Sequence, residues 1–191
     1  MSLIIFMETN EGMLIAADSR LSRKTDPNWH RDDAYKLFEC GNRIGIAYHG
    51  DADINGEPMD RIIMKFLSTV EINDTFHCIV DKMQSFIKSK GNPVSKFYLF
   101  GYDNDKRLIA QFNVSDNSLF DMSDAVHGTG GNDEIAWPFL HGKLDIHDTN
   151  EEAIALIDYL FSETIAKLDT VGGPIDILLV AHKGTQWIRR K

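Results

Sequence analysis

The order in which two apolar patterns follow one another along the chain most constrains its fold. Short apolar runs around Asn, Asp or Gly turns predict β-hairpins, whereas apolar residues three and four apart predict helices. The strand pattern falls at residues 2–17, 36–48, 96–120 and 175–188. The helical pattern predicts two helices within 53–90, one after Gly131 and one over 150–168.

Hairpins clustered on either side of helix pairs favour an α+β fold of mostly antiparallel sheets with helices packed outside. Thr149 and Glu152 form a capping-box pattern before the helix at 150–168. The polar segment 19–34 contains Pro27 and is predicted to be a loop. Periodicity alone leaves two architectures open, a four-layer αββα sandwich and a simpler two-layer α+β fold.

Composition narrows the class of protein. A chain of 191 residues fits one domain, 1–191, and a formal net charge of −9 argues against a nucleic-acid-binding surface. No apolar run reaches the length of a membrane helix, and residues 1–8 lack the basic start of a signal peptide. Cys40 and Cys78 stand singly, which predicts reduced thiols, no metal site and a cytoplasmic protein. The basic residues 189–191 are expected to be solvated.

Three segments carry a resemblance to a known family. Residues 11–20, EGMLIAADSR, are similar to the strand that ends in Asp-Ser-Arg in proteasome β subunits and their bacterial two-ring relatives. Residues 35–52 resemble the lysine-bearing strand and the strand that ends in Gly, and 169–173 resemble the loop before the final hairpin. The resemblance implies the four-layer αββα sandwich of N-terminal-nucleophile (Ntn) hydrolases, and assembly into a homo-oligomeric ring.

The resemblance also implies a catalytic centre. The nucleophile position falls on Ser2, which removal of Met1 would expose, and the α-amine of Ser2 would then serve as the base. Lys36 and Asp18 match the family's lysine and acid. A nearby ammonium lowers the pKa of the nucleophile, and Asp18 would keep Lys36 charged and oriented.

Supporting residues are transferred in the same way. Gly50 matches the glycine whose backbone N–H forms the oxyanion hole. Thr129 falls where the family has a serine near the terminal amine, and Asp169 matches a supporting aspartate. Val171 departs from the pattern because a serine is expected there. Ser2 departs as well, because the family nucleophile is usually threonine.

The expected substrate is a peptide or protein. The residues placed beside its specificity pocket are Leu21, Ser22, Tyr48 and Ala52. No cofactor and no metal are expected, and neither are nucleic-acid or membrane partners. An ATPase partner is not identified by any motif. His49 and His127 lack the sequence context of a serine hydrolase and are expected to be structural or surface residues.

Three functions remain open. The first is a proteasome-type peptidase that uses Ser2. The second is an Ntn amidase that acts on a small amide, and an open cleft would favour it. The third is a catalytically inactive assembly subunit, which is supported by the missing hydroxyl at Val171.

Overall fold

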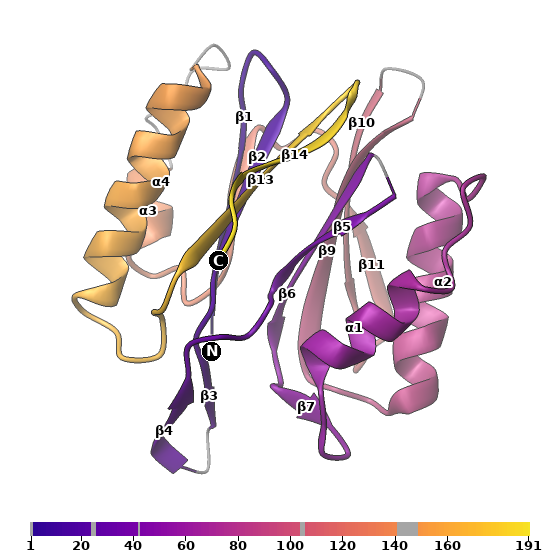
Figure 1. Cartoon of the computed structure of the whole chain (residues 1–191), viewed down its shortest axis with the longest axis horizontal. Helices are drawn as coiled ribbons and strands as arrows, with labels where there is room; N and C mark the ends of the chain where they lie inside the picture. Colours follow the sequence, from indigo (N-terminus) through magenta and orange to yellow (C-terminus); the bar gives the residue numbers. More distant parts are fainter. Residues whose placement is uncertain (1, 24–25, 42, 104–105, 141–148) are drawn as a thin grey trace.

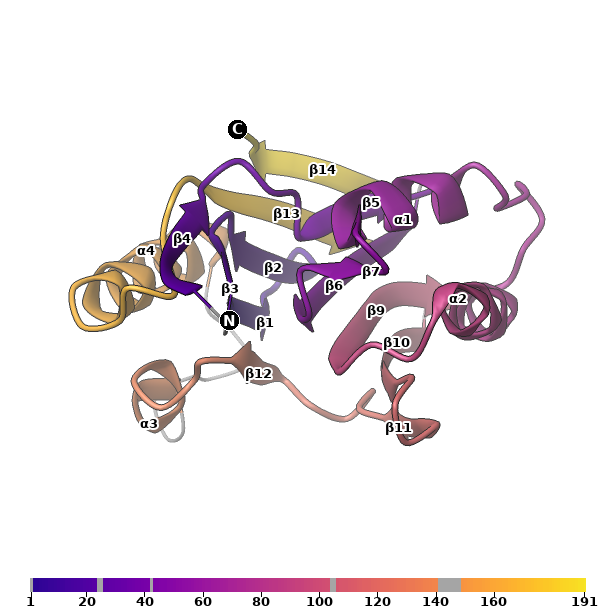
Figure 2. The ribbon, with the colours of Figure 1, turned by 90° about the horizontal axis from the view of Figure 1, so that it is seen from below.

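The computed structural model describes residues 2–23, 26–41, 43–103, 106–140 and 149–191. It is an α+β structure, as the sequence predicts, and its two larger sheets are antiparallel throughout. The first sheet has the order β12-β1-β2-β13-β14. These strands are β12 (His127–Gly131), β1 (Leu3–Glu8), β2 (Met13–Asp18), β13 (Ile175–Ala181) and β14 (Gly184–Arg189). Figure 2 shows β12 and β14 at opposite edges of this sheet.

The second sheet has the order β11-β10-β9-β6-β5. Its strands are β11 (Ser118–Asp121), β10 (Lys106–Asn113), β9 (Ser95–Asp103), β6 (Ile44–Gly50) and β5 (Leu37–Cys40). A short ribbon of β7 (Asp53–Ile54) and β8 (Glu57–Pro58) follows β6 and leads into the first helix.

Helices cover the outer faces of the two sheets (Figure 1). The helices are α1 (Met59–Leu67), α2 (Phe76–Lys90), α3 (Ala136–Leu140) and α4 (Asn150–Ile165). Residues of α1 and α2 share a core cluster with the second sheet, and residues of α3 and α4 share one with the first. A third cluster fills the space between the sheets. Among the described residues, no helix is long and apolar enough to cross a membrane.

Strand β1 shows how the sequence produces these layers. Its residues are almost all apolar, because both faces of the strand are buried. Ile4 and Phe6 point toward the second sheet, while Leu3, Ile5 and Met7 point toward α3 and α4. Burial of one such side chain contributes about 2 kcal/mol.

The predicted capping box is confirmed. The Thr149 hydroxyl accepts a hydrogen bond from the Glu152 backbone N–H at 3.3 Å, and the Glu152 carboxylate accepts one from the Thr149 N–H at 3.0 Å. Both contacts satisfy N–H groups that would otherwise lack a partner at a helix start.

The loop predicted over 19–34 is wrong in part. Strands β3 (Leu21–Arg23) and β4 (Asp26–Arg31) form a hairpin of their own, which extends beyond both sheets in Figure 1. The pairing joins two polar segments and therefore leaves no apolar alternation in the sequence. The hairpin begins just after β2, close to the labelled N-terminus of the chain.

The prediction missed β12 and misjudged the basic end of the chain. Strand β12 is mostly glycine, because a Cβ at Gly128 would lie 2.4 Å from Phe6 Cζ and one at Gly130 would lie 2.7 Å from Tyr98 Oη. At the C-terminal end, Arg189 forms a bidentate ion pair with Asp158, at 2.6 and 2.8 Å. The prediction that the basic residues 189–191 are only solvated is therefore wrong for Arg189.

Candidate active site

Ser2 lies immediately before β1 and is only 2% exposed. Its carbonyl oxygen accepts a hydrogen bond from the Asn132 backbone N–H at 2.7 Å. The neighbouring Gly131 has φ of +91°, and a Cβ there would lie 1.9 Å from the Ser2 oxygen. Only glycine therefore lets β12 approach Ser2 this closely.

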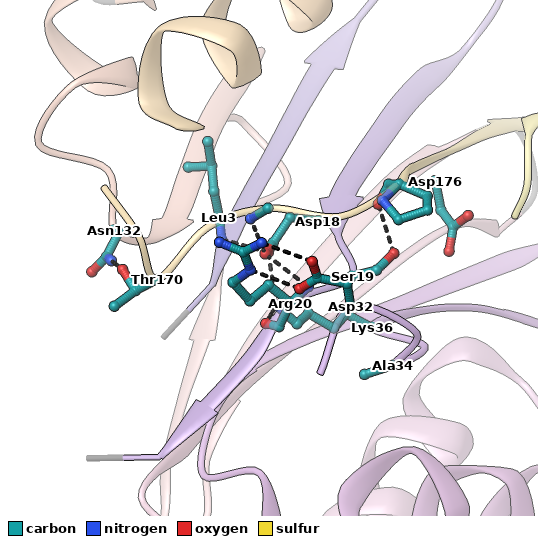
Figure 3. Close-up of polar contacts among 12 residues, drawn as sticks. Leu3, Asp18, Ser19, Arg20, Asp32, Ala34, Lys36, Asn132, Thr170 and Asp176 are labelled. Carbon is teal, nitrogen blue, oxygen red and sulfur yellow. Dashed lines mark hydrogen bonds and ion pairs between the residues drawn. The ribbon is translucent and has the colours of Figure 1, made fainter. Parts of the chain in front are cut away.

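The carboxylate of Asp18 accepts several hydrogen bonds near Leu3, at the start of β1 (Figure 3). Because Ile4 pairs with Ala17 in the antiparallel hairpin, Asp18 comes level with Leu3. Asp18 Oδ1 accepts hydrogen bonds from the Leu3 N–H at 2.9 Å and from Lys36 Nζ at 2.8 Å. Asp18 Oδ2 accepts two more, from the Arg20 N–H at 3.2 Å and the Gly172 N–H at 3.1 Å.

Lys36 is 1% exposed and lies just before β5. Its ammonium donates to Asp18 Oδ1 and to the carbonyl oxygen of Arg20. Burial lowers the pKa of Lys36, and the negative charge of Asp18 opposes that change. Asp18 and Lys36 thus meet as predicted, and Asp18 connects the lysine to the backbone of the residue that follows Ser2.

A second ion pair, absent from the predicted site, packs beside the first. Arg20 Nε and Nη2 donate to Asp32 at 2.6 and 2.7 Å, and Nη1 donates to the Asp169 carbonyl oxygen at 3.0 Å. The pairing raises the pKa of Arg20 and lowers the pKa of Asp32. Gly172 packs closely against this guanidinium, because a Cβ at Gly172 would lie 2.7 Å from Arg20 Cζ and the arginine would have to move. The motif at 11–20 includes Arg20, whereas no local pattern marks Asp32.

Gly50 ends β6 and is exposed, with φ of +126°. A Cβ at Gly50 would lie 2.3 Å from the Val94 carbonyl oxygen. The following residue is also fixed, because the Asp51 N–H donates to Ser95 Oγ at 2.9 Å. The backbone at Gly50 is thus held in a shape that other residues rarely adopt.

His49 points between the sheets and lies beside the glycine edge of β12. Its ring stacks on Tyr98 with centroids 5.9 Å apart, and Nε2 lies 3.4 Å from Tyr98 Oη. A Cβ at Gly131 would lie 3.6 Å from His49 Cγ, so the imidazole and Ser2 approach the same glycine. Burial lowers the pKa of His49 to about 4, which keeps the ring neutral near neutrality.

Thr129, Asp169 and Val171 are the other residues that were compared with the family's site, and each has its own neighbours in the structure. Thr129 pairs with Ile5 rather than with Ser2, and its hydroxyl donates to Asp133 at 3.1 Å. The Asp169 side chain is exposed, and its backbone oxygen contacts Arg20. Val171 is fully buried in the cluster under α4. The adjacent Thr170 hydroxyl accepts from Asn132 Nδ2 at 2.5 Å.

The residues predicted to bind substrate come from two regions. Leu21, which is 4% exposed, and Ser22 lie on β3, while Ala52 is half-buried after β6. Tyr48 faces the α1 side of the second sheet, and its ring stacks between Phe38 and Phe97. Tyr48 is therefore part of the core at this end of the sheet. The roles of these four residues stay predictions.

Two further features bear on the chemistry of the site. Within the described ranges, no group of three His, Cys, Asp or Glu side chains is placed to hold a metal ion. A cavity of about 640 Å³ lies at the other end of β5, lined in part by Cys40, Gly41 and Phe76. Lys36 lies at one end of the strand and this cavity at the other, so the cavity is separate from the candidate site.

The fold and the buried centre define a class of protein: an αβ sandwich whose first strand begins beside a buried Lys–Asp pair. Solved structures that share this fold include Anbu proteins. A Gly-1 mutant of Anbu from Hyphomicrobium sp. strain MC1 has a TM-score of 0.77 and 16% identity over 100% of this chain and 87% of that one. Anbu from Pseudomonas aeruginosa, solved as a helical assembly, gives 0.77 and 15% over 99% and 86%.

Anbu from Yersinia bercovieri, described as an ancestral beta-subunit, has a TM-score of 0.75 and 11% identity over 99% of this chain and 88% of that one. At such identities the likeness shows the fold alone. No family model matches the chain, and no curated protein matches it in sequence.

The family prediction is therefore corrected. The three motifs predicted a proteasome β-subunit-like peptidase, but the structural neighbours are Anbu proteins, which are a distinct family. The motifs follow the strand ends and the glycine loop of a shared fold. They do not separate the families built on it.

Proposed function

We propose that this protein is an N-terminal-nucleophile amide hydrolase in which Ser2 is the nucleophile once Met1 has been removed. The antiparallel sheets and the helices on their outer faces support the four-layer αββα arrangement on which such enzymes are built. The proposed substrate is a peptide or protein, and the single, free cysteines support a cytoplasmic location.

One observation carries the proposal: Asp18 Oδ1 accepts both the Lys36 ammonium and the Leu3 backbone N–H, at 2.8 and 2.9 Å. A fully buried ion pair is costly and seldom improves stability over an apolar pair. Here the pair lies directly beside the first residues of β1. This position supports the proposal that the charge of Lys36 tunes a nucleophile at Ser2.

The proposed chemistry uses groups of this chain alone. The free α-amine of Ser2 takes the hydroxyl proton as Ser2 Oγ attacks the substrate carbonyl carbon. The N–H of Gly50 donates to the oxyanion that forms. The C–N bond then breaks, the leaving nitrogen takes the proton from the α-ammonium, and water later hydrolyses the ester on Ser2. Lys36 stabilises the developing negative charge on Ser2 Oγ throughout.

We also propose that the protein assembles with copies of itself. The Anbu of Pseudomonas aeruginosa forms a helical assembly, and the present chain spans 86% of that chain. A closed ring and a helical assembly both use a repeated contact between unlike faces of one chain. An ATPase partner is not part of this proposal.

The test is the intact mass of the natively started protein before and after a peptide epoxyketone, which bonds to both the hydroxyl and the amine of a terminal residue. We expect loss of one methionine and then a single adduct on Ser2. The Ser2→Ala variant should lose methionine but take no adduct, and the exposed-turn control Ser115→Ala should behave as wild type. Lys36→Met should react far more slowly than wild type.

The same experiment separates the chief alternative, a catalytically inactive assembly subunit. Val171 favours it, because this position carries a fully buried apolar side chain instead of the expected hydroxyl. A retained Met1 with no adduct, in protein that is folded, would reject the hydrolase and support the inactive subunit. Turnover of small amides but not of peptides would support an amidase.

A further inference from the structure

The cavity of about 640 Å³ at the far end of β5 has the form of a binding site. It opens between the turn that joins β5 to β6 and the segment that joins α1 to α2. Its lining includes three buried apolar residues, Ile44, Phe76 and Ile79. Its volume lies in the range of sites that take up a whole side chain or a small ligand.

Ile72 stands on the rim of this cavity and is 99% exposed. Hydrogen bonds hold the loop that carries Ile72. The Glu71 N–H donates to Asp74 Oδ2 at 2.7 Å, and the Asp74 N–H donates to the Glu71 carbonyl oxygen at 3.0 Å. Lys82 in turn holds both Asp74 oxygens, at 2.6 and 2.8 Å. Ile72 is thus an apolar side chain presented to solvent by an ordered loop.

The rim also carries charges of both signs. Arg43 lies on one side, and Glu71 and Asp103 lie on the others; all are exposed. None of the three forms an ion pair with any residue that the structure describes. A rim with charges of both signs can set a cation of one copy against an anion of a second copy across a two-fold axis.

We propose that this surface is a two-fold contact between two copies of the chain, in which each copy's Ile72 enters the other copy's cavity. Ile72 and the cavity lie side by side on one face of the chain. Two copies can therefore each insert Ile72 into the other's cavity only if a two-fold axis relates them. The same axis places Arg43 of each copy near Glu71 of the other. This contact between like faces is additional to the contact between unlike faces proposed above, and it does not rest on the proposed chemistry, since it lies at the other end of β5 from Lys36.

Sedimentation velocity of the full chain over a wide concentration range tests the contact. Ile72→Asp should weaken the paired species by about a thousandfold, because two apolar side chains per pair return to water. Val94→Asp is the matched control: Val94 is 64% exposed and lies beyond the other end of α2, and this change should leave the mass distribution as in wild type. Since Ile72 is almost fully exposed on its own chain, the variant should have the melting temperature of wild type at dilutions where both proteins are monomeric.

Charge reversal adds a test that a merely structural role would not pass. Arg43→Glu and Glu71→Arg should each weaken pairing, and the double variant should restore it. Three results would overturn the proposal: a wild type that is monomeric throughout, an Ile72→Asp variant that pairs like wild type, or a double variant no better than the singles. None of them affects the epoxyketone adduct on Ser2, so the two proposals fail separately.

Discussion

The buried pair of Lys36 and Asp18 allows a prediction in which a second mutation restores stability lost to the first. Asp18→Ala removes the carboxylate and leaves the Lys36 ammonium buried with one remaining acceptor, the Arg20 carbonyl. It also removes the carboxylate acceptor of the backbone N–H groups of Leu3, Arg20 and Gly172. We expect Asp18→Ala to lower the free energy of unfolding by about 5 kcal/mol.

Lys36→Met should cost much less. The Asp18 carboxylate then keeps all three backbone donors, which solvate its charge, and methionine fills most of the lysine volume. We expect a loss of about 2–3 kcal/mol. In the double variant the unpaired ammonium is gone, so it should be more stable than Asp18→Ala alone by about 2 kcal/mol.

Urea unfolding followed by tryptophan fluorescence measures these differences. With a slope of about 2 kcal/mol per molar urea, the double variant should unfold about 1 M later than Asp18→Ala. All variants are compared at one protein concentration, so that self-association contributes equally. A double variant that is less stable than Asp18→Ala, or Lys36→Met that is as damaging as Asp18→Ala, would refute this account of the pair.

Three further predictions concern the rest of the structure. The pKa of His49 is lowered to about 4 in the folded protein, so between pH about 6.5 and 4 the imidazole is protonated in the unfolded chain but neutral in the folded one. The free energy of unfolding should therefore fall by about 2–3 kcal/mol from pH 6.5 to 4. His49→Gln should remove this contribution to the pH dependence of stability. Gly131→Ala should cost more than about 3 kcal/mol, because its Cβ would overlap the Ser2 oxygen, whereas Gly56→Ala, at φ of +83° with no atom within 4 Å, should cost about 1 kcal/mol. Thr149→Ala should cost about 1 kcal/mol through loss of the helix cap.

Each of these predictions can fail on its own. An unchanged pH slope in His49→Gln would mean that the imidazole is solvated in the folded protein. Equal costs at Gly131 and Gly56 would mean that backbone strain, not close approach of β12, decides the effect. An unchanged melting temperature in Thr149→Ala would mean that water replaces the cap without loss.

Much of the fold could be predicted because its signals are local. The hairpin of β1 and β2, the paired helices α1 and α2, and the start of α4 at Thr149 each follow from periodicity or capping within about twenty residues. Strand β12 and the β3–β4 hairpin could not be predicted, because the signal for a strand is an apolar pattern and neither segment has one.

The candidate site, like the fold, could be predicted only in part. The sequence singled out Asp18 and Lys36 by a motif, but the neighbours that complete the site are remote in the chain. Asp32 reaches Arg20 only because the β3–β4 hairpin turns back, and Gly172 reaches Asp18 across 154 positions. No periodic pattern records such contacts.

By itself, then, the sequence determined most of the order of helices and strands, since periodicity and capping are local. Its resemblance to a known family also singled out Asp18 and Lys36. Only the tertiary structure decided which partners those charges have, that His49 lies beside Ser2, and that a cavity and an exposed Ile72 adjoin on one face. The reason is physical: hydrogen bonds and close backbone approaches depend on distances in space, which chain folding sets.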